Sequence, residues 1–153
     1  MYGLSADAPY PRTEGITQDR ESVRIISPAY ADRGSELTAI LQYVFHATVF
    51  SGLQMKQYSR LLTEIAVSEM HHLDILGGIT SCPPRLFDFY STAAVCYSCE
   101  PEKMIRDDIR GEQEAIRQYQ SMLRRLCNEQ VSVIISRIIR DEELHLQTLH
   151  SIM

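Results

Sequence analysis

From about residue 29 onward, apolar residues recur with the 3.6-residue period of amphipathic helices. The pattern predicts four helices, at Ala29 to about Ser51, Leu53 to about Leu76, Pro101 to about Cys127, and from after Asn128 to the end. Gly52 separates the first two helices, and Gly77-Gly78 is expected to end the second. Pro101 suits the first position of a helix, where its missing N–H is not needed.

The four helices fall into two pairs, because each pair is joined by a short turn. A long connection, about residues 79 to 100, separates the pairs and contains two consecutive prolines. Short turns place helices antiparallel, and one long crossover connection can join two such helix pairs in a bundle. The sequence therefore predicts an all-α four-helix bundle, built from two antiparallel helix pairs with a long crossover between helices two and three.

Residues 1–28 differ from the rest of the chain. Three of the six prolines and two of the seven glycines lie there, which favours an extended N-terminal arm. Within it, the segment ESVRII suggests a short strand or a strap lying on the body. We therefore divide the chain into an extended arm, residues 1–28, and a bundle domain, residues 29–153.

Composition narrows the class of protein. With 44% hydrophobic and 23% charged residues, the chain has the make-up of a globular domain, and its net charge of −5 argues against nucleic-acid binding. No apolar run is long enough to span a membrane, and no secretory signal is evident, so we expect a cytoplasmic protein. The single CxxC pair, Cys96 and Cys99, favours loop cysteines over a metal or redox site, because a structural metal site needs four ligands.

Polar residues recur inside the apolar pattern in matching contexts. The segments ELTAILQY, Glu36 to Tyr43, and EQEAIRQY, Glu112 to Tyr119, both read E-x-x-A-I-x-Q-Y. The segments EMHHLDIL and EELHLQTL both read E-x-x-H-L-x-x-L. Each helix pair therefore carries one lone glutamate and one Glu-x-x-His motif.

Helix rise predicts that these residues meet in space. In the first pair, the lone glutamate lies 16 residues before Gly52 and the motif glutamate lies 17 residues after it. In the second pair, the corresponding separations from Asn128 are 16 and 14 residues. At about 1.5 Å per residue, the members of each pair lie at one level. Six candidate metal ligands then share one layer of the core: Glu36, Glu69, His72, Glu112, Glu142 and His145.

Four buried carboxylates need compensating positive charge, because burying even one unpaired carboxylate is costly. Two divalent cations would balance them, and a donor set rich in oxygen and without thiolate favours two iron or two manganese ions over zinc. Taken singly, a Glu-x-x-His motif is more often a solvated face or a core histidine; the coincidence of two motifs and two lone glutamates favours a dinuclear site. Tyr43 and Tyr119 could be core residues or could hydrogen-bond a ligand glutamate, and the sequence supports both interpretations equally.

Three segments carry a resemblance to a known family. SELTAILQYVFHA resembles the first helix of bacterioferritins, IAVSEMHHLDILGGI the second helix of bacterioferritins and manganese catalases, and IIRDEELH their fourth helix. Over about residues 30 to 150, the chain resembles the ferritin-like superfamily. The resemblance implies that the six residues named above are metal ligands, with Glu69 and Glu142 bridging the two metals, or with one of them bridging and the other terminal.

The sequence also departs from individual members of that superfamily. It ends eight residues after His145, so we do not expect the fifth helix or the 24-subunit shell of bacterioferritin. Ala115 stands where rubrerythrins carry a further glutamate. Met70 falls where bacterioferritin has its haem-ligating methionine, but we favour a methionine packed in a dimer contact and do not expect haem. His71 is expected at the surface or an interface.

These observations lead to a functional expectation. We expect an oxidoreductase that uses a di-iron or di-manganese centre on H₂O₂ or O₂, with catalase, peroxidase or ferroxidase-like chemistry, and with Tyr43 and Tyr119 as candidate catalytic residues. The alternatives are an iron-storage protein of the ferritin type and a bundle that its metals stabilise structurally. We expect a homodimer, because bundles of this kind commonly associate through helix faces.

Overall fold

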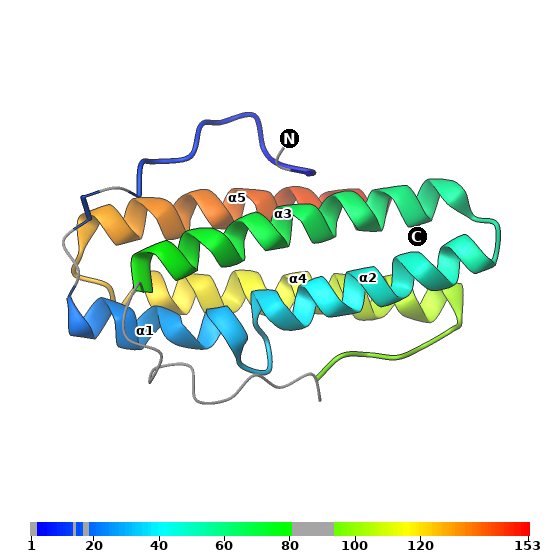
Figure 1. The fold of residues 1–153 in the computed structure, drawn as a ribbon, viewed down its shortest axis with the longest axis horizontal. Helices are drawn as coiled ribbons and strands as arrows, with labels where there is room; N and C mark the ends of the chain where they lie inside the picture. The colour runs from blue at the N-terminus through cyan, green and yellow to red at the C-terminus, as the bar shows by residue number, and fades with distance from the viewer. Residues whose placement is uncertain (1–2, 14, 17–18, 81–93) are drawn as a thin grey trace.

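The computed structural model describes residues 3–13, 15–16, 19–80 and 94–153, and all regular structure in these ranges is helical. The helices are α1 (Arg20–Ala31), α2 (Glu36–Gly52), α3 (Lys56–Thr80), α4 (Pro101–Leu123) and α5 (Glu129–Ile152). The four long helices, α2 to α5, lie side by side along the long axis, and the short α1 lies beside one end of the bundle (Figure 1). The predicted all-α four-helix bundle is confirmed.

Local signals fix where the long helices begin. Ser35 caps α2, because its hydroxyl oxygen accepts a hydrogen bond from the Thr38 N–H at 3.3 Å. Asn128 caps α5 in the same way, accepting from the Val131 N–H at 3.2 Å. Pro101 is the first residue of α4, as predicted. These caps fix the register of the helices that carry the polar layer.

The structure differs from the prediction over residues 20–28, which form α1 and not an extended strap or strand. Asp19 caps α1, and the helix continues through Pro28 because its apolar face is buried in the bundle. Burial of a fully buried isoleucine stabilises by about 1.5–3 kcal/mol, which offsets much of the cost of an interior proline. α2 begins at Glu36 and not at Ala29, since residues 32–35 separate it from α1.

Two further helix ends differ from the prediction. Gly77 and Gly78 lie inside α3, which runs to Thr80, and α4 ends at Leu123 and not near Cys127. Most of the predicted crossover, residues 81–93, lies outside the described residues. Its last part, residues 94–100, is not helical and leads into α4.

Residues 3–13 run along the outside of α3 and α5 without regular structure (Figure 1). The Leu4 N–H donates to the Glu64 carbonyl of α3 at 3.1 Å, which ties this segment to the bundle. No helix in the described part of the chain is long and apolar enough to cross a membrane.

Two apolar clusters form the core. One surrounds α1 and the ends of α3 and α5 next to it, with residues such as Ile26, Leu76 and Ile135. The other lies toward the α2–α3 turn, with residues such as Phe50, Leu62 and Leu149. The polar layer lies between these clusters along α3 and α5. Its side chains are therefore shielded from water at both ends.

Candidate metal centre

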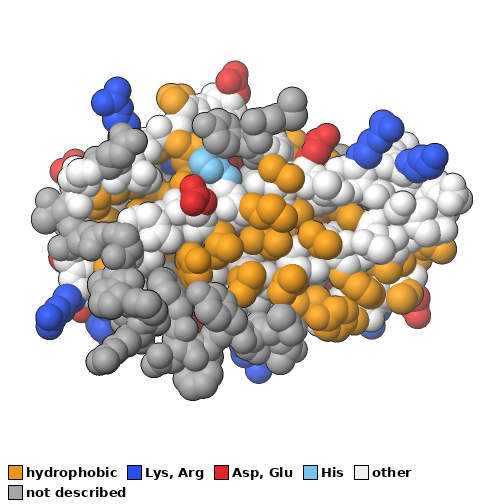
Figure 2. All heavy atoms as spheres, in the orientation of Figure 1, with side chains coloured by type: hydrophobic (Ala, Val, Ile, Leu, Met, Phe, Trp, Pro, Cys, Tyr) orange, Lys and Arg blue, Asp and Glu red, His pale blue; other side chains and the backbone are white. Residues whose placement is uncertain are grey.

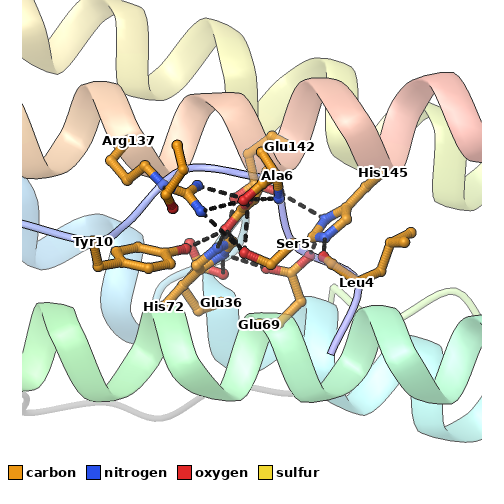
Figure 3. Close-up of polar contacts among 12 residues, drawn as sticks. Leu4, Ser5, Ala6, Tyr10, Glu36, Glu69, His72, Arg137, Glu142 and His145 are labelled. Carbon is orange, nitrogen blue, oxygen red and sulfur yellow. Dashed lines mark hydrogen bonds and ion pairs between the residues drawn. The ribbon is translucent and has the colours of Figure 1, made fainter. Parts of the chain in front are cut away.

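The structure brings the six predicted ligands together in the middle of the bundle. α2 and α4 contribute one glutamate each, and α3 and α5 contribute one Glu-x-x-His motif each. Figure 3 shows Glu36 and the two motifs pointing toward one another. Every one of the six residues is at most 4% exposed. Their donor atoms form two groups, within each of which all atoms lie within 4.8 Å of one another: Glu36, Glu69, His72 and Glu142, and Glu69, Glu112, Glu142 and His145.

The two groups share Glu69 and Glu142, and the shared carboxylates point one oxygen toward each histidine. Glu69 Oε2 lies 2.8 Å from His72 Nδ1, and Glu69 Oε1 lies 3.1 Å from His145 Nδ1. Glu142 Oε1 lies 3.2 Å from His72 Nδ1, and Glu142 Oε2 lies 3.3 Å from His145 Nδ1. Two carboxylates placed in this way would be able to hold a pair of cations between the histidines.

The two remaining carboxylates each lie near one histidine. Glu36 Oε2 is 3.6 Å from His72 Nδ1, and Glu112 Oε1 is 3.7 Å from His145 Nδ1. Each group therefore has one histidine, one carboxylate of its own and two shared carboxylates.

The far nitrogen of each histidine is held by a hydrogen-bond acceptor. His72 Nε2 lies 3.1 Å from Asp141 Oδ2, and His145 Nε2 lies 2.8 Å from the Leu4 carbonyl oxygen. Because both partners accept, each Nε2 carries the proton. In a neutral ring this leaves the Nδ1 lone pair facing the carboxylates, where a cation would be bound.

The repeated E-x-x-A-I-x-Q-Y motif has a structural explanation. The Tyr43 hydroxyl on α2 donates to Glu112 on α4, and the Tyr119 hydroxyl on α4 donates to Glu36 on α2. The tyrosine of each copy therefore orients the glutamate of the other copy. Both tyrosines are also buried. The sequence allowed either a core residue or a hydrogen bond to a glutamate at these positions, and the structure shows both features together.

The buried carboxylates of this layer shift one another's pKa values. Burial raises the pKa of Glu36 and Glu112, and the nearby charges of Glu69 and Glu142 raise it further. Burial alone would also raise the pKa of Glu69, but His145 and His72 lower it more strongly.

Both histidines are affected in the opposite way. Burial lowers the pKa of His72 and His145, but the surrounding carboxylates outweigh it and hold both values well above the usual range. Protons on Glu36, Glu112 and both imidazoles would offset the charge of the four carboxylates. Two divalent cations carry the same charge as those four protons.

The donor set fits two such cations. Four carboxylates and two imidazoles converge in one buried layer, which is the chemistry expected for iron or manganese. Among the described residues, Glu142 Oε1 and His145 Nδ1 are buried within 3.2 and 3.1 Å of oppositely charged neighbours but form no well-directed hydrogen bond. Such inward-facing polar atoms are costly unless something binds them.

A cavity of about 230 Å³ between α2 and α4 reaches this layer. Its inner wall includes Glu36, Glu69, Glu112 and Glu142, and Arg33 and Arg110 lie among its other lining residues. Ala115, which stands where rubrerythrins have a further glutamate, also lines it and leaves the space open. A structural metal site is usually closed, whereas a catalytic one leaves room for a small ligand.

The sequence analysis missed a polar network next to this cavity. His46 Nδ1 lies 2.8 Å from Asp108 Oδ1, and its Nε2 lies 2.8 Å from the Cys96 carbonyl. Gln42 donates to Asp108 at 2.9 Å and accepts from the Cys96 N–H at 3.0 Å. Burial lowers the pKa of His46, but the hydrogen bond and charge of Asp108, together with the Cys96 carbonyl and Asp107, outweigh it, so the pKa is raised. The network attaches residues 94–100 to α2 and α4. In the sequence, only Asp108, which lies one helical turn before Glu112, pointed to it.

Asp141 and Arg137 on α5 were also missed. Asp141 is completely buried, accepts from His72 and forms an ion pair with Arg137 at 2.7 Å. Hydrogen bonds from His72, Tyr10 and Arg137 lower the pKa of Asp141 against the raising effect of burial. Asp141 directly precedes Glu142, and this adjacency in IIRDEELH was the available signal.

Other singled-out residues lie outside the centre. Met70 is 46% exposed on α3, and its predicted dimer contact and its less favoured haem role both stay predictions. His71 is half-buried, and its ring meets the Tyr10 ring edge-on with centroids 4.7 Å apart. Its neighbour is therefore the N-terminal segment of its own chain. Cys96 and Cys99 are free thiols.

The family can now be stated. Residues 32–153 match the ferritin family, described as a ferritin-like domain, and the chain belongs to this family. The fold is also similar to two crystal structures of KatB, a manganese catalase from Anabaena, one of them specified as strain PCC7120. Each comparison has a TM-score of 0.80 at 14% sequence identity and covers 96% of this chain and 77% of KatB. No curated protein sequence matches the chain. The fold and the buried carboxylate and histidine cluster fit a dinuclear metal protein.

Proposed function

We propose that this protein is an oxidoreductase that uses a dinuclear iron or manganese centre on H₂O₂ or O₂. The observation that carries the proposal is the placement of Glu69 and Glu142, each of which turns one oxygen toward each histidine. Two metal ions held there would supply two-electron redox chemistry toward a small oxidant. Glu36, Glu112, His72 and His145 would complete the ligand set.

The cavity supports a small reactant. Its volume of about 230 Å³ suits water, O₂ or H₂O₂, and it is below the roughly 300–1,000 Å³ typical of sites for larger organic ligands. The protein excludes bulk water with two apolar clusters, while Tyr43 and Tyr119 orient the carboxylates on the cavity side. The likeness to a manganese catalase supports peroxide as the oxidant.

Membership of the ferritin-like family supports a second candidate, iron oxidation and storage. Storage needs a closed shell of many subunits, whereas peroxide chemistry needs only the bundle or a small oligomer. The mass of the metal-loaded protein in solution separates the two, because a monomer or dimer cannot enclose a mineral core.

A homodimer is also part of the proposal. Apolar side chains gather on one face of the molecule, over α2 and α3 (Figure 2). Among the described residues, Val44 of α2 and Val67 and Met70 of α3 are large apolar side chains that are exposed. A patch of this kind favours association with a second copy. Met70→Glu should then shift the protein toward monomer in sedimentation equilibrium, and an unchanged mass would contradict this assignment.

The central experiment measures metal content and reactivity together. The purified chain is loaded with Mn²⁺ or Fe²⁺, and metal per chain, O₂ release from H₂O₂, and O₂ consumption are measured. We expect two metals per chain and reaction with at least one oxidant. Two bound metals without peroxide or O₂ reactivity would overturn the enzyme and leave a structural metal bundle.

A matched pair of variants tests the site itself. Glu142→Ala removes a shared carboxylate and should lower metal content and abolish turnover, because both groups lose a ligand. Glu143→Ala removes the adjacent exposed carboxylate and should change neither. Equal metal content in the two variants would show that the ligand set is wrong.

A further inference from the structure

Of the N-terminal arm predicted from the sequence, residues 3–10 run past the outer side of the two histidines (Figure 3). These residues are called the arm below. At Leu4 the backbone forms two hydrogen bonds in opposite directions. Its N–H donates to the Glu64 carbonyl at 3.1 Å, and its carbonyl accepts from His145 Nε2 at 2.8 Å. The position of the arm on α3 therefore determines the partner that orients His145.

The next part of the arm acts on Asp141. The Ser5 hydroxyl donates at 3.1 Å, the Ala6 N–H donates at 2.7 Å, and the Tyr10 hydroxyl also donates to this carboxylate. Asp141 in turn accepts from His72 Nε2 at 3.1 Å. Three donors from the arm thus fix the carboxylate that orients the second histidine.

Arg137 secures the arm from the α5 side. Its guanidinium donates to the Ala8 carbonyl at 3.0 Å, to the Ala6 carbonyl at 2.9 Å and to Asp141 at 2.7 Å. It also lies over the Tyr10 ring, 4.1 Å from the ring centroid. The arginine is 5% exposed, so these bonds form in a buried setting where they are stronger than at the surface.

We propose that the N-terminal arm is a positioning element of the metal centre, in which the Leu4 carbonyl orients His145 and the Ser5, Ala6 and Tyr10 donors orient His72 through Asp141. The two halves of the arm would then control two different metal positions. The proposal rests on the proposed function only in assuming that the two histidines bind metal. If it is correct, metal affinity also depends on a segment that lies 131 to 141 residues away in sequence from the residues it contacts.

The physical reason is that a ligand histidine needs its far nitrogen held. The bond at Nε2 fixes the tautomer and the ring plane, and its loss typically lowers metal affinity by roughly 10- to 100-fold. The arm supplies this bond directly to one histidine and indirectly to the other. A change at one end should therefore weaken one metal position more than the other.

Gly3 offers a way to displace the Leu4 end with a single methyl group. Its φ is +71°, and a Cβ there would lie 2.2 Å from the Glu64 carbonyl oxygen and 2.6 Å from the Ser68 nitrogen. Gly15 is the matched control, because its φ is +77° but no described atom lies within 4 Å of a Cβ built there. Alanine is strained by positive φ at both positions, so a difference between the variants reports the collision with α3.

Tyr10→Phe addresses the other half. It keeps the ring under Arg137 and removes only the hydroxyl that donates to Asp141. The experiment titrates the metal-free proteins with Mn²⁺ by calorimetry and records the electron paramagnetic resonance spectrum, which distinguishes single from coupled Mn²⁺ ions. Far-ultraviolet circular dichroism of the metal-free proteins checks the fold.

The expected results form a pattern. Gly3→Ala should weaken one of the two Mn²⁺ binding steps by about tenfold or more and reduce the coupled signal, while Gly15→Ala should match the wild type. Tyr10→Phe should weaken one step by about tenfold. Combined with His145→Ala, Gly3→Ala should have no further effect on the remaining step, whereas Tyr10→Phe should still weaken it.

Each contrary result has a distinct meaning. If the wild type binds two Mn²⁺ and both arm variants bind them equally well, the arm proposal is overturned and the proposed function stands. If the wild type binds neither Mn²⁺ nor, in the same titration without oxygen, Fe²⁺, the proposed function and the arm proposal both fail. If Gly3→Ala does not fold, Tyr10→Phe decides, and unchanged affinity in that variant overturns the arm proposal.

Discussion

On the α3–α5 face of the centre, the far nitrogens of the histidines have fixed partners, the Leu4 carbonyl of the arm and Asp141 of α5. On the α2–α4 face, a cavity reaches the carboxylates. The covered face uses ionised and backbone groups, such as Asp141 and the Leu4 carbonyl. The open face uses neutral phenols, Tyr43 and Tyr119, on the two unshared glutamates. If the centre binds metals as proposed, this contrast predicts that one face sets ligand geometry while the other admits reactants.

The largest expected effect is the pH dependence of Mn²⁺ affinity, which involves titratable groups on both faces. Burial and neighbouring carboxylates raise the pKa of Glu36 and Glu112 on the open face, and carboxylates raise the pKa of His72 and His145 against burial on the covered face. A raised pKa means that each group holds its proton to a higher pH than usual, and a cation that binds there must displace the protons still held. Affinity for Mn²⁺ should therefore increase as pH rises, by up to about a hundredfold per pH unit for each ion.

Calorimetric titration at several pH values between 6 and about 8 measures this dependence, and buffers of different ionisation enthalpy count the protons released. The Glu142→Ala variant serves as the comparison, because its smaller carboxylate charge should retain fewer protons. Affinity that is constant over this range would contradict the assigned charge balance.

The next effect should fall on the open face alone. Ala115→Leu adds three carbons to the cavity wall and should reduce kcat/KM for H₂O₂ by about tenfold or more, since even a small displacement of a reactant is costly. Metal content should stay at two per chain, because no ligand is changed. Arg117→Leu, at an exposed position of α4, is the control.

The result is read from two measurements, elemental analysis and peroxide turnover. Reduced turnover with unchanged metal content supports the cavity as the route to the centre. Unchanged turnover would show that reactants arrive elsewhere, and the contrast between the faces would then lose its functional meaning.

The smallest effect should come from the phenols. Tyr43→Phe removes the donor to Glu112, and Tyr119→Phe removes the donor to Glu36; each should weaken Mn²⁺ binding by about tenfold, or about 1.4 kcal/mol. Because the two bonds are reciprocal, the two losses should be similar. Tyr58→Phe, whose ring stacks on Phe50 away from the centre, should leave affinity unchanged. If only one of the two variants, Tyr43→Phe or Tyr119→Phe, lost Mn²⁺ affinity, the two hydrogen bonds would not be equivalent.

The sequence allowed the bundle and the six central residues to be predicted because both depend on spacing within helices. Glu36, Glu69, Glu112 and Glu142 could be placed at one level from turn positions and helix rise alone. The two repeats then identified which polar residues faced inward. Local periodicity was sufficient, since each of these positions is fixed by its own helix.

The covered face could not be predicted, because it depends on contacts between residues far apart in the chain. Leu4 contributes only a backbone carbonyl, which no residue type announces, and Tyr10 meets Asp141 across 131 positions. α1 was missed for a different reason. Pro28 suggested a break, but burial of the helix in the core keeps the chain helical to Ala31.

The sharing of Glu69 and Glu142 has a mechanical consequence for the whole chain. α2 packs chiefly on α3 and α4 chiefly on α5, so the molecule consists of two hairpins. Each cluster of four donors draws side chains from both hairpins, and neither hairpin alone holds a complete set. Ions bound in the middle would act as cross-links between the hairpins. Metal binding would then raise the free energy of unfolding of the whole bundle. The protein would gain stability and redox activity in the same step.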